Sequence, residues 1–305
     1  MKKQERNMLL KFVLPVVAVF LIFFVYPSLR TIYMSFYKMG SLSMDPAEWE
    51  FAGFSNYVDM FKNPLFVKSW VNVLKIAVIG GAAVFIIALF FAVTLSAKFK
   101  GSKVMRAIVY LPNIITPVAM VTMWNQYIYN NEYGLFHELF SFLHLDALAD
   151  IPWTSSEWAF RSMMVAFCFG SVGYYMIIYL SAMEKIPADY YDYAALEGAS
   201  KFYMFRRITM PLLRDTTRTA VTFWMMGAIN FFLWSRVFNV NPLAPETMVP
   251  ANLMFNMVFG GSTSGGSVTK MNVGGGCAVG VFLCVAVVVV FSIINFLGNK
   301  DRYEY

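Results

Sequence analysis

The chain has 305 residues, of which 59% are hydrophobic and 14% are charged, and its mean hydropathy is +0.58. This composition excludes an ordinary soluble domain and indicates a membrane protein with several spans. The net charge of +6 requires no nucleic acid as a partner, because loops on the inner side of a membrane are basic for topological reasons.

Six segments are predicted to cross the membrane as helices of a single all-α domain that covers residues 1–305. A span needs about 20 mostly apolar residues, because every backbone polar group in the hydrocarbon must be hydrogen-bonded within the helix. No Asp or Glu falls in the predicted spans, which argues against a carrier driven by protons or sodium ions. The predicted spans are residues 8–26, 76–97, 107–129, 162–183, 216–238 and 273–297.

The first predicted span follows Lys2, Lys3 and Arg6, a basic start that would also suit a secretory signal. The apolar run is long for a signal and no A-x-A cleavage site follows it. A retained span is therefore the preferred interpretation, and a cleaved signal is the alternative. With the N-terminus inside, most of the 24 Lys and Arg residues fall on the inner side. The positive-inside rule then predicts that both termini and the loop 186–211 are cytoplasmic.

The cysteines and histidines form no recognisable disulfide or metal pattern. Cys168, Cys277 and Cys284 lie in predicted spans without a CxxC pair, which favours a packing role. His137 and His144 lie in a predicted outer loop and are interpreted as surface residues rather than metal ligands. We therefore predict no metal site.

The glycine-rich run 260–270 superficially resembles a loop that holds phosphate groups. A P-loop requires Lys and then Ser or Thr directly after its last glycine, and this run lacks that order. It is predicted to be a flexible outer loop, and we do not expect this chain to hydrolyse ATP through such a site. Four glycines in the spans are instead predicted to allow close helix packing. They are Gly80, Gly81, Gly276 and Gly280.

The fourth and fifth predicted spans are joined by the loop 186–211, whose residues favour two short helices. Pro187 suits the first turn of a helix, since it lacks the N–H that would be unsatisfied there. Gly198 can adopt the left-handed conformation that ends a helix and reverses the chain. Ser200 is placed to cap a second helix, and Pro211 is expected to end the loop.

Apolar and aromatic side chains in this loop form a candidate docking surface for another protein. Aromatic residues are common anchors at protein interfaces. The alternative is an ordinary amphipathic helix that lies on the membrane surface. The side chains are Tyr190, Tyr193, Ala194 and Leu196 in the first helix and Phe202, Tyr203 and Phe205 in the second.

The runs Asp192–Ala199 and Ile208–Pro211 resemble the EAA loop of bacterial binding-protein-dependent ABC importers, in particular of their MalF/UgpA-like permeases for carbohydrates. In that family the loop reads approximately E-A-A-x-x-D-G-A and is followed by I-x-L-P. Asp192 replaces the first Glu and Glu197 replaces the Asp, so both negative charges are kept. Tyr193 replaces an Ala and is much larger, which implies a different local fit to the partner.

The similarity extends over most of the chain in weaker motifs that keep the family's order. After Phe238 the family's T-x-G-G-P pattern is absent, and Asn239–Pro242 stands in its place. The segments that resemble the family are residues 51–57, 63–66, 111–112 and 174–180.

The resemblance implies a MalF-type permease of a type I ABC importer, embedded in the lipid of a bacterial inner membrane. In that family a second homologous permease completes the solute path, and two ATPase subunits below it use ATP and Mg. An extracytoplasmic binding protein delivers the sugar. The chain itself is then a transport subunit that binds no cofactor and is not an enzyme. The residues expected to contact the ATPase are Asp192, Tyr193, Ala194, Glu197, Gly198, Ala199, Phe202 and Phe205.

By analogy with maltose-type permeases, the solute path is expected on the fourth and fifth spans. Aromatic rings beside polar groups suit the apolar faces and polar rims of sugars. The equal alternative is that these aromatic residues only pack between helices or against the partner permease. The candidates are Gly170, Ser171, Tyr174, Trp224, Ala228, Asn230 and Phe231.

Other functions stay open at this point. A permease of the same architecture could import a glycerophosphodiester or a uronate oligomer. A stand-alone channel or a membrane enzyme is a further alternative, although the sequence offers neither a catalytic constellation nor a self-complementary pore.

Overall fold

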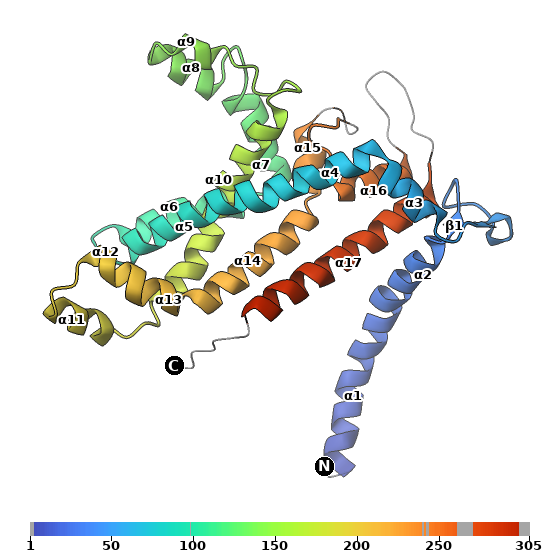
Figure 1. Cartoon of the computed structure of the whole chain (residues 1–305), viewed down its shortest axis with the longest axis horizontal. Helices are drawn as coiled ribbons and strands as arrows, with labels where there is room; N and C mark the ends of the chain where they lie inside the picture. The colour runs from blue at the N-terminus through green and yellow to red at the C-terminus, as the bar shows by residue number, and fades with distance from the viewer. Residues whose placement is uncertain (1–2, 98, 240, 242–243, 261–270, 299–305) are drawn as a thin grey trace.

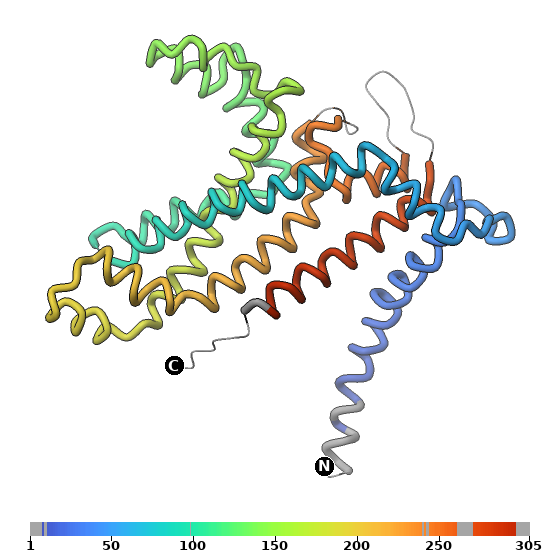
Figure 2. The backbone as a smooth tube through the Cα atoms, viewed as in Figure 1, coloured from blue at the N-terminus to red at the C-terminus, as the bar shows by residue number. Residues whose placement is uncertain are grey.

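The computed structural model describes residues 3–97, 99–239, 241, 244–260 and 271–298 (Figures 1 and 2). The long helices α5, α10, α14 and α17 lie together in one bundle, α2 packs against α17, and α1 extends away from the bundle (Figure 1). The helices of the first half are α1 (Lys3–Phe20), α2 (Tyr26–Met34), α3 (Ser55–Lys62), α4 (Pro64–Lys75), α5 (Gly81–Ser96), α6 (Ser102–Ile114), α7 (Pro117–Met123), α8 (Leu135–Phe142) and α9 (Asp146–Ala149).

The second half of the chain supplies the remaining helices. Between α2 and α3, in the first half, a small antiparallel sheet pairs β1 (Tyr37–Lys38) with β2 (Glu50–Phe51). Most of the glycine-rich run, residues 261–270, lies outside the described residues. The helices are α10 (Ala159–Met183), α11 (Asp189–Leu196), α12 (Lys201–Met204), α13 (Met210–Leu212), α14 (Arg214–Ile229), α15 (Leu233–Phe238), α16 (Pro250–Phe259) and α17 (Val273–Gly298).

In the part of the chain that the structure describes, four helices are long and apolar enough to cross a membrane, or five if one bent pair counts as a span. The second of them begins at Pro64 rather than at the expected Ile76. Asn63 caps this helix by accepting a hydrogen bond from the Leu65 N–H, and Pro64 suits the first helical position. The four are Lys11–Met34, Pro64–Ser96, Ala159–Met183 and Val273–Phe296.

The span expected over residues 107–129 is broken into α6 and α7, which meet at an angle of 99°. Thr116 is extended, as is usual for a residue before proline, and Pro117 begins α7. The Thr116 hydroxyl accepts a hydrogen bond from the Ala119 N–H at 3.4 Å and so caps the new helix. The sequence interpretation expected one continuous helix here and overlooked the break that Thr116 and Pro117 impose.

The span expected over residues 216–238 is also not one helix. Helix α14 has 16 residues and ends at Ile229, and α15 begins only at Leu233. By length alone α14 falls short of the roughly 20 residues that a span requires. The Asn230 side chain donates a hydrogen bond to the Met226 carbonyl at 3.0 Å. The Met226 carbonyl also accepts the backbone N–H of Asn230 at 3.1 Å, so the side chain adds a second hydrogen bond to the last turn of α14.

Between α4 and α5, the π-helical turn Ile76–Gly80 lies against α10 and α14. The Trp224 Nε1–H donates to the Ala77 carbonyl at 3.0 Å. A Cβ at Gly81 would lie 2.7 Å from the same indole nitrogen. The predicted role of Gly80 and Gly81 in close packing is therefore confirmed, because a side chain at Gly81 would displace Trp224. Likewise, a Cβ at Gly276 would lie 2.5 Å from a Val258 methyl group.

A small helical module, α8 with α9, follows α7 and projects from one side of the bundle (Figure 1). Its base is aromatic, with the Tyr129 and Trp153 rings stacked at 5.8 Å. The Tyr129 hydroxyl donates to the Ser162 carbonyl at 2.9 Å. A ring nitrogen of His137 lies 3.3 Å from the Ala149 carbonyl and so joins α8 to α9.

Candidate functional site

The 186–211 loop folds as a helix, a turn and a second helix at one end of the bundle (Figure 1). Gly198 makes the turn with a φ of +75°, a conformation that other residues adopt only with strain. Ser200 then caps α12, since its hydroxyl accepts a hydrogen bond from the Tyr203 N–H at 3.3 Å. Both predicted features, the glycine turn and the serine cap, are confirmed.

The predicted roles of the two prolines in the loop need correction. Pro187 precedes α11, which begins at Asp189 with Ala188 as its cap. Pro211 does not end the loop, because the chain stays helical from α12 through a π-helical turn and α13. Pro211 lies in the first turn of α13, where a missing N–H is tolerated. The second half of the loop is thus joined to α14 by an almost continuous helical path.

The loop presents large apolar side chains to the surroundings. Tyr193, Leu196 and Phe202 are 70%, 83% and 72% exposed, and Tyr190 and Tyr203 are about half exposed. Among the other predicted contact residues, Asp192, Glu197 and Gly198 are exposed, whereas Ala194, Ala199 and Phe205 are half-buried. Exposed aromatic and aliphatic groups at this density are typical of an interaction surface.

A pocket of about 400 Å³ separates the loop from the helix ends beneath it. Val93 and Ser96 line it from α5, Met183 from α10, and Tyr191 and Phe205 from the loop. Tyr191 and Thr209 both line this pocket, and their hydroxyls are 3.0 Å apart and form a hydrogen bond that ties α11 to the segment after α12. The loop is thus held together internally and borders an open pocket.

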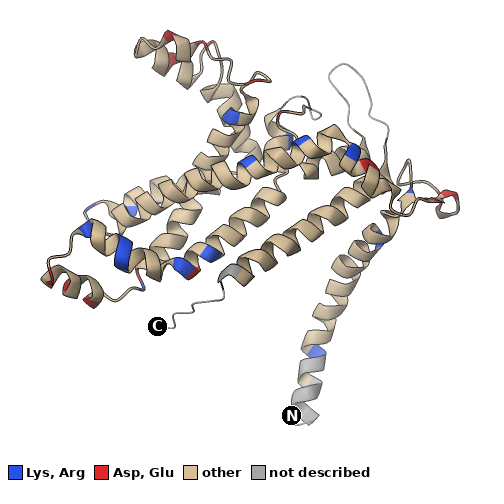
Figure 3. Ribbon diagram, viewed as in Figure 1, with Lys and Arg blue, Asp and Glu red and all other residues tan. Residues whose placement is uncertain are grey.

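Lys and Arg residues are concentrated around the same end of the bundle, on α12 and the turn after it, at the start of α14 and near the start of α6 (Figure 3). Helix α11 carries acidic residues instead, among them Asp189 and Asp192 in its first turn. Their charges are favourable there because the N-terminal end of a helix is positive. The loop therefore offers an acidic first helix beside a basic second one.

A second pocket, of about 180 Å³, lies between α6, α10 and α14. It brings together the predicted path residues Ser171, Tyr174 and Trp224 with Asn113 and Gly227, which the sequence interpretation missed. The Asn113 amide also donates to the Gly170 carbonyl at 3.3 Å. Asn113 directly follows the Leu111-Pro112 motif, which could have indicated it, but the bend that follows it was not foreseen.

The other predicted path residues do not line this pocket. Ala228 and Phe231 are buried in the core, and Phe231 packs edge-on against Phe167 at 4.8 Å. Gly170 is buried beside Trp234, and Asn230 is exposed with its amide bonded to its own helix. Trp224 contributes only an edge, because 3% of its surface is exposed. In this structure Trp224 mainly packs between helices rather than offering a face for a sugar to stack on.

Metal-ligating groups do not gather in the described part of the chain, where no set of three or more His, Cys, Asp and Glu side chains could hold a metal ion. Cys168 and Cys277 are buried and Cys284 is exposed, and none of the three forms a disulfide.

Apolar helices surround a small pocket whose lining carries no charge, and a loop protrudes at one end, an arrangement that fits a membrane transport component. Over residues 84–300 the sequence matches the family of binding-protein-dependent transport system inner membrane components, and the chain belongs to that family. It is thus a multi-pass inner-membrane permease of the ABC importer class.

Two of the relatives are permeases for sugars. The chain is 26% identical over 295 residues to the diacetylchitobiose uptake system permease protein NgcF of Streptomyces coelicolor, with 93% of this chain and 79% of the relative covered. It is 27% identical over 233 residues to the trehalose/maltose transport system permease protein MalF of Thermococcus litoralis, with 76% and 77% covered.

The fold is shared with a solved chain of a bacterial ABC transporter involved in the import of the acidic polysaccharide alginate. The TM-score is 0.81 and the sequence identity 20%, with 98% of both chains covered. At this identity the similarity establishes the fold, which agrees with the predicted all-α, MalF-type permease architecture.

Proposed function

We propose that this chain forms one half of the solute path of an ATP-driven importer for a sugar or an oligosaccharide. A second, homologous permease forms the other half, two ATPase subunits consume ATP and Mg, and an extracytoplasmic binding protein delivers the sugar. The sugar permeases among its relatives support the substrate class. A neighbour of the same fold is known in complex with a periplasmic protein that holds an alginate pentasaccharide, which supports the binding-protein partner.

The exposed 186–211 loop is the observation that carries the proposed coupling to the ATPase. Its apolar side chains, led by Leu196 at 83% exposure, require a cover in the assembled transporter. The basic residues around it support a cytoplasmic position for this loop and for both termini. An ATPase subunit that held the loop through these side chains would move it as one body, because the Tyr191–Thr209 bond and the Gly198 turn fix its shape.

The lining of the 180 Å³ pocket favours a neutral sugar over a uronate oligomer. Its polar groups include the amide of Asn113 and the hydroxyls of Ser171, Tyr174 and Tyr175, and its lining includes no Lys or Arg. Carboxylates of a uronate would be left without a cation there, which is costly in a low-dielectric pocket. Hydroxyl groups of a neutral sugar, in contrast, can both donate to and accept from amide and hydroxyl side chains.

Transport by the complete importer, reconstituted in vesicles with its binding protein, tests this function. A neutral oligosaccharide should be imported and should stimulate ATP hydrolysis. Tyr174→Ala should raise the KM for transport by about fivefold to tenfold, because the loss of one hydrogen bond or ring contact to the sugar costs roughly 1–1.5 kcal/mol. Tyr174 is 39% exposed and lines the pocket.

Ile177→Ala is the matched control, because Ile177 lies on the same helix, is 37% exposed and does not line the pocket. Its KM should stay at the wild-type value. Import of a uronate oligomer in preference to neutral sugars would contradict the proposed substrate class, and equal KM values for both variants would contradict the proposed path.

A further inference from the structure

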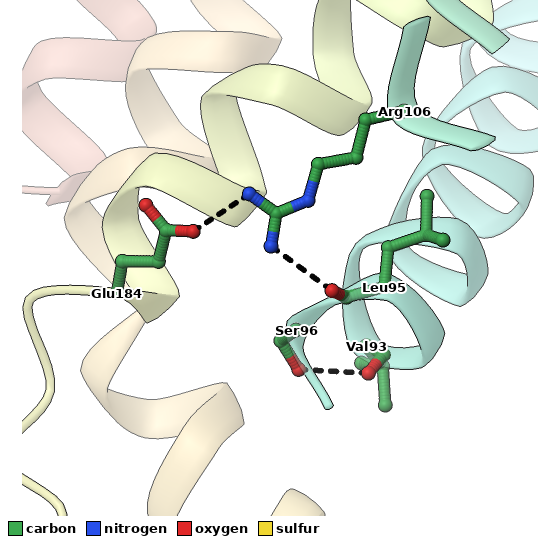
Figure 4. Close-up of polar contacts among 5 residues, drawn as sticks. All are labelled: Val93, Leu95, Ser96, Arg106 and Glu184. Carbon is green, nitrogen blue, oxygen red and sulfur yellow. Dashed lines mark hydrogen bonds and ion pairs between the residues drawn. The ribbon is translucent and has the colours of Figure 1, made fainter. Parts of the chain in front are cut away.

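Arg106 joins three helix ends at the end of the bundle that carries the 186–211 loop (Figure 4). Its Nη1 donates to Glu184 Oε1 at 2.9 Å, and its Nη2 donates to the carbonyl of Leu95 at 3.0 Å. Arg106 lies near the start of α6, Leu95 in the last turn of α5, and Glu184 directly after the last residue of α10. One guanidinium group thus connects α5 and α6 to Glu184, at the end of α10 and two residues before the loop.

Glu184 occupies a position that its own helix disfavours. The C-terminal end of a helix is negative, so a carboxylate directly after α10 is unfavourable unless a cation lies close to it. Arg106 provides that cation, and it also donates to a carbonyl in the last turn of α5, which has no partner within its own helix. The position of Glu184 is therefore explained by the connection between helices and not by the stability of α10 alone.

The Arg106 contact adds little to the stability of the protein, but it fixes how Glu184 and the Leu95 carbonyl are placed relative to each other. The Arg106 and Glu184 side chains are 23% and 45% exposed, and ion pairs with such access to water contribute little to stability. Leu95, however, is 1% exposed, so its carbonyl belongs to the packed core. The planar guanidinium can direct separate N–H groups at two acceptors and hold them in a fixed arrangement, which a lysine cannot reproduce.

Glu184 and α6, which Arg106 connects, reach the two pockets described above: the pocket beneath the loop and the pocket proposed for the solute. Glu184 lies two residues before the loop and lines the 400 Å³ pocket beneath it. Helix α6 runs from Arg106 to Asn113 in the 180 Å³ pocket, just before the 99° bend. We propose that Arg106 is a positioning residue that transmits displacement of the loop, through Glu184, to α5 and α6. This inference rests on the proposed coupling of the loop to an ATPase.

The test compares solute imported with ATP hydrolysed in the complete importer reconstituted in vesicles. In Arg106→Ala, stimulated ATP hydrolysis should stay within about twofold of wild type while solute imported per ATP falls by about threefold to thirtyfold, the range expected for residues that couple distant sites. Arg106→Lys should restore part of the ratio, because an ammonium group can reach Glu184 but cannot serve both acceptors equally well. Glu184→Gln, which keeps an acceptor oxygen without the charge, should also lower the ratio of solute imported to ATP hydrolysed. This variant tests the same contact if Arg106→Ala does not assemble into the importer.

Lys103→Ala is the control, since Lys103 is exposed on the same helix and also carries a positive charge. Its ratio should equal that of wild type. A wild-type ratio in both Arg106→Ala and Glu184→Gln would overturn the inference, as would a parallel fall of hydrolysis and import with an unchanged ratio. A normal response of Gly198→Asp in the same assay would instead contradict the proposed function of the loop, so the two failures can be told apart.

Discussion

Gly198→Asp is expected to abolish coupled import by the assembled transporter while the chain still inserts and folds. Gly198 has a φ of +75°, and a Cβ there would meet no atom of this chain within 4 Å. The new carboxylate would therefore point into the space where we propose that the ATPase binds. An unpaired charge buried in that interface costs more than about 1 kcal/mol, so ATPase binding should weaken at least about tenfold.

Copurification of the ATPase with the permease, followed by ATP hydrolysis and import, measures this effect. Gly53→Asp is the control, because Gly53 also has a positive φ, of +53°, and a Cβ there would meet only a Phe51 ring carbon, at 4.0 Å. Gly53 lies between β2 and α3, at the end of the bundle opposite the loop (Figure 1). Gly198→Asn separates the charge from the size, since asparagine also tolerates the left-handed conformation. Wild-type import by Gly198→Asp would refute the role of the loop.

Gly173→Leu should prevent α6 from packing on α10 and should lower the stability of the whole permease. A Cβ at Gly173 would lie 2.4 Å from the Val109 carbonyl oxygen and 2.7 Å from the Tyr110 Cα, both of them backbone atoms. Backbone cannot rotate away as a side chain can, so the two helices must separate. Overpacking of this kind costs about 1–3 kcal/mol, and a leucine at a backbone contact lies at the upper end.

Thermal unfolding of the detergent-solubilised importer, followed by size-exclusion chromatography, measures this loss. Gly227→Leu is the control on α14, because a Cβ there would meet nothing within 4 Å. Its unfolding temperature should stay close to that of wild type, although its position in the 180 Å³ pocket should impair import. An unchanged unfolding temperature for Gly173→Leu would mean that α6 and α10 do not pack as closely as described.

The sequence predicted the class, the helical fold and the outline of the loop because those features depend on local composition. Gly198 and Ser200 each act through their own backbone or the next turn, and both were identified correctly. The end of the loop was not identified correctly, because the helical path through Pro211 depends on the π-helical turn before it and on α14 after it. Pro211 read in isolation is a helix breaker, whereas in context it sits in a first turn.

The candidate solute path was less predictable, because it depends on how helices from distant parts of the chain face one another. Trp224 suits a sugar face by its chemistry, yet its indole is committed to the Ala77 carbonyl and to the space that Gly81 leaves. Asn113 enters the pocket from α6, and only the packing of α6 on α10 brings it beside Tyr174. No periodicity within a single span reveals either arrangement.

Photo-crosslinking from position 196 tests the central claim most directly. Leu196 is 83% exposed in the 186–211 loop, and Phe142, on the α8–α9 module, is 81% exposed and serves as the matched control. A photoreactive phenylalanine at position 196 should crosslink to the ATPase subunit in the assembled importer, and the same group at position 142 should not. Equal labelling of the ATPase from both positions, or crosslinks from position 196 to lipid alone, would contradict the account.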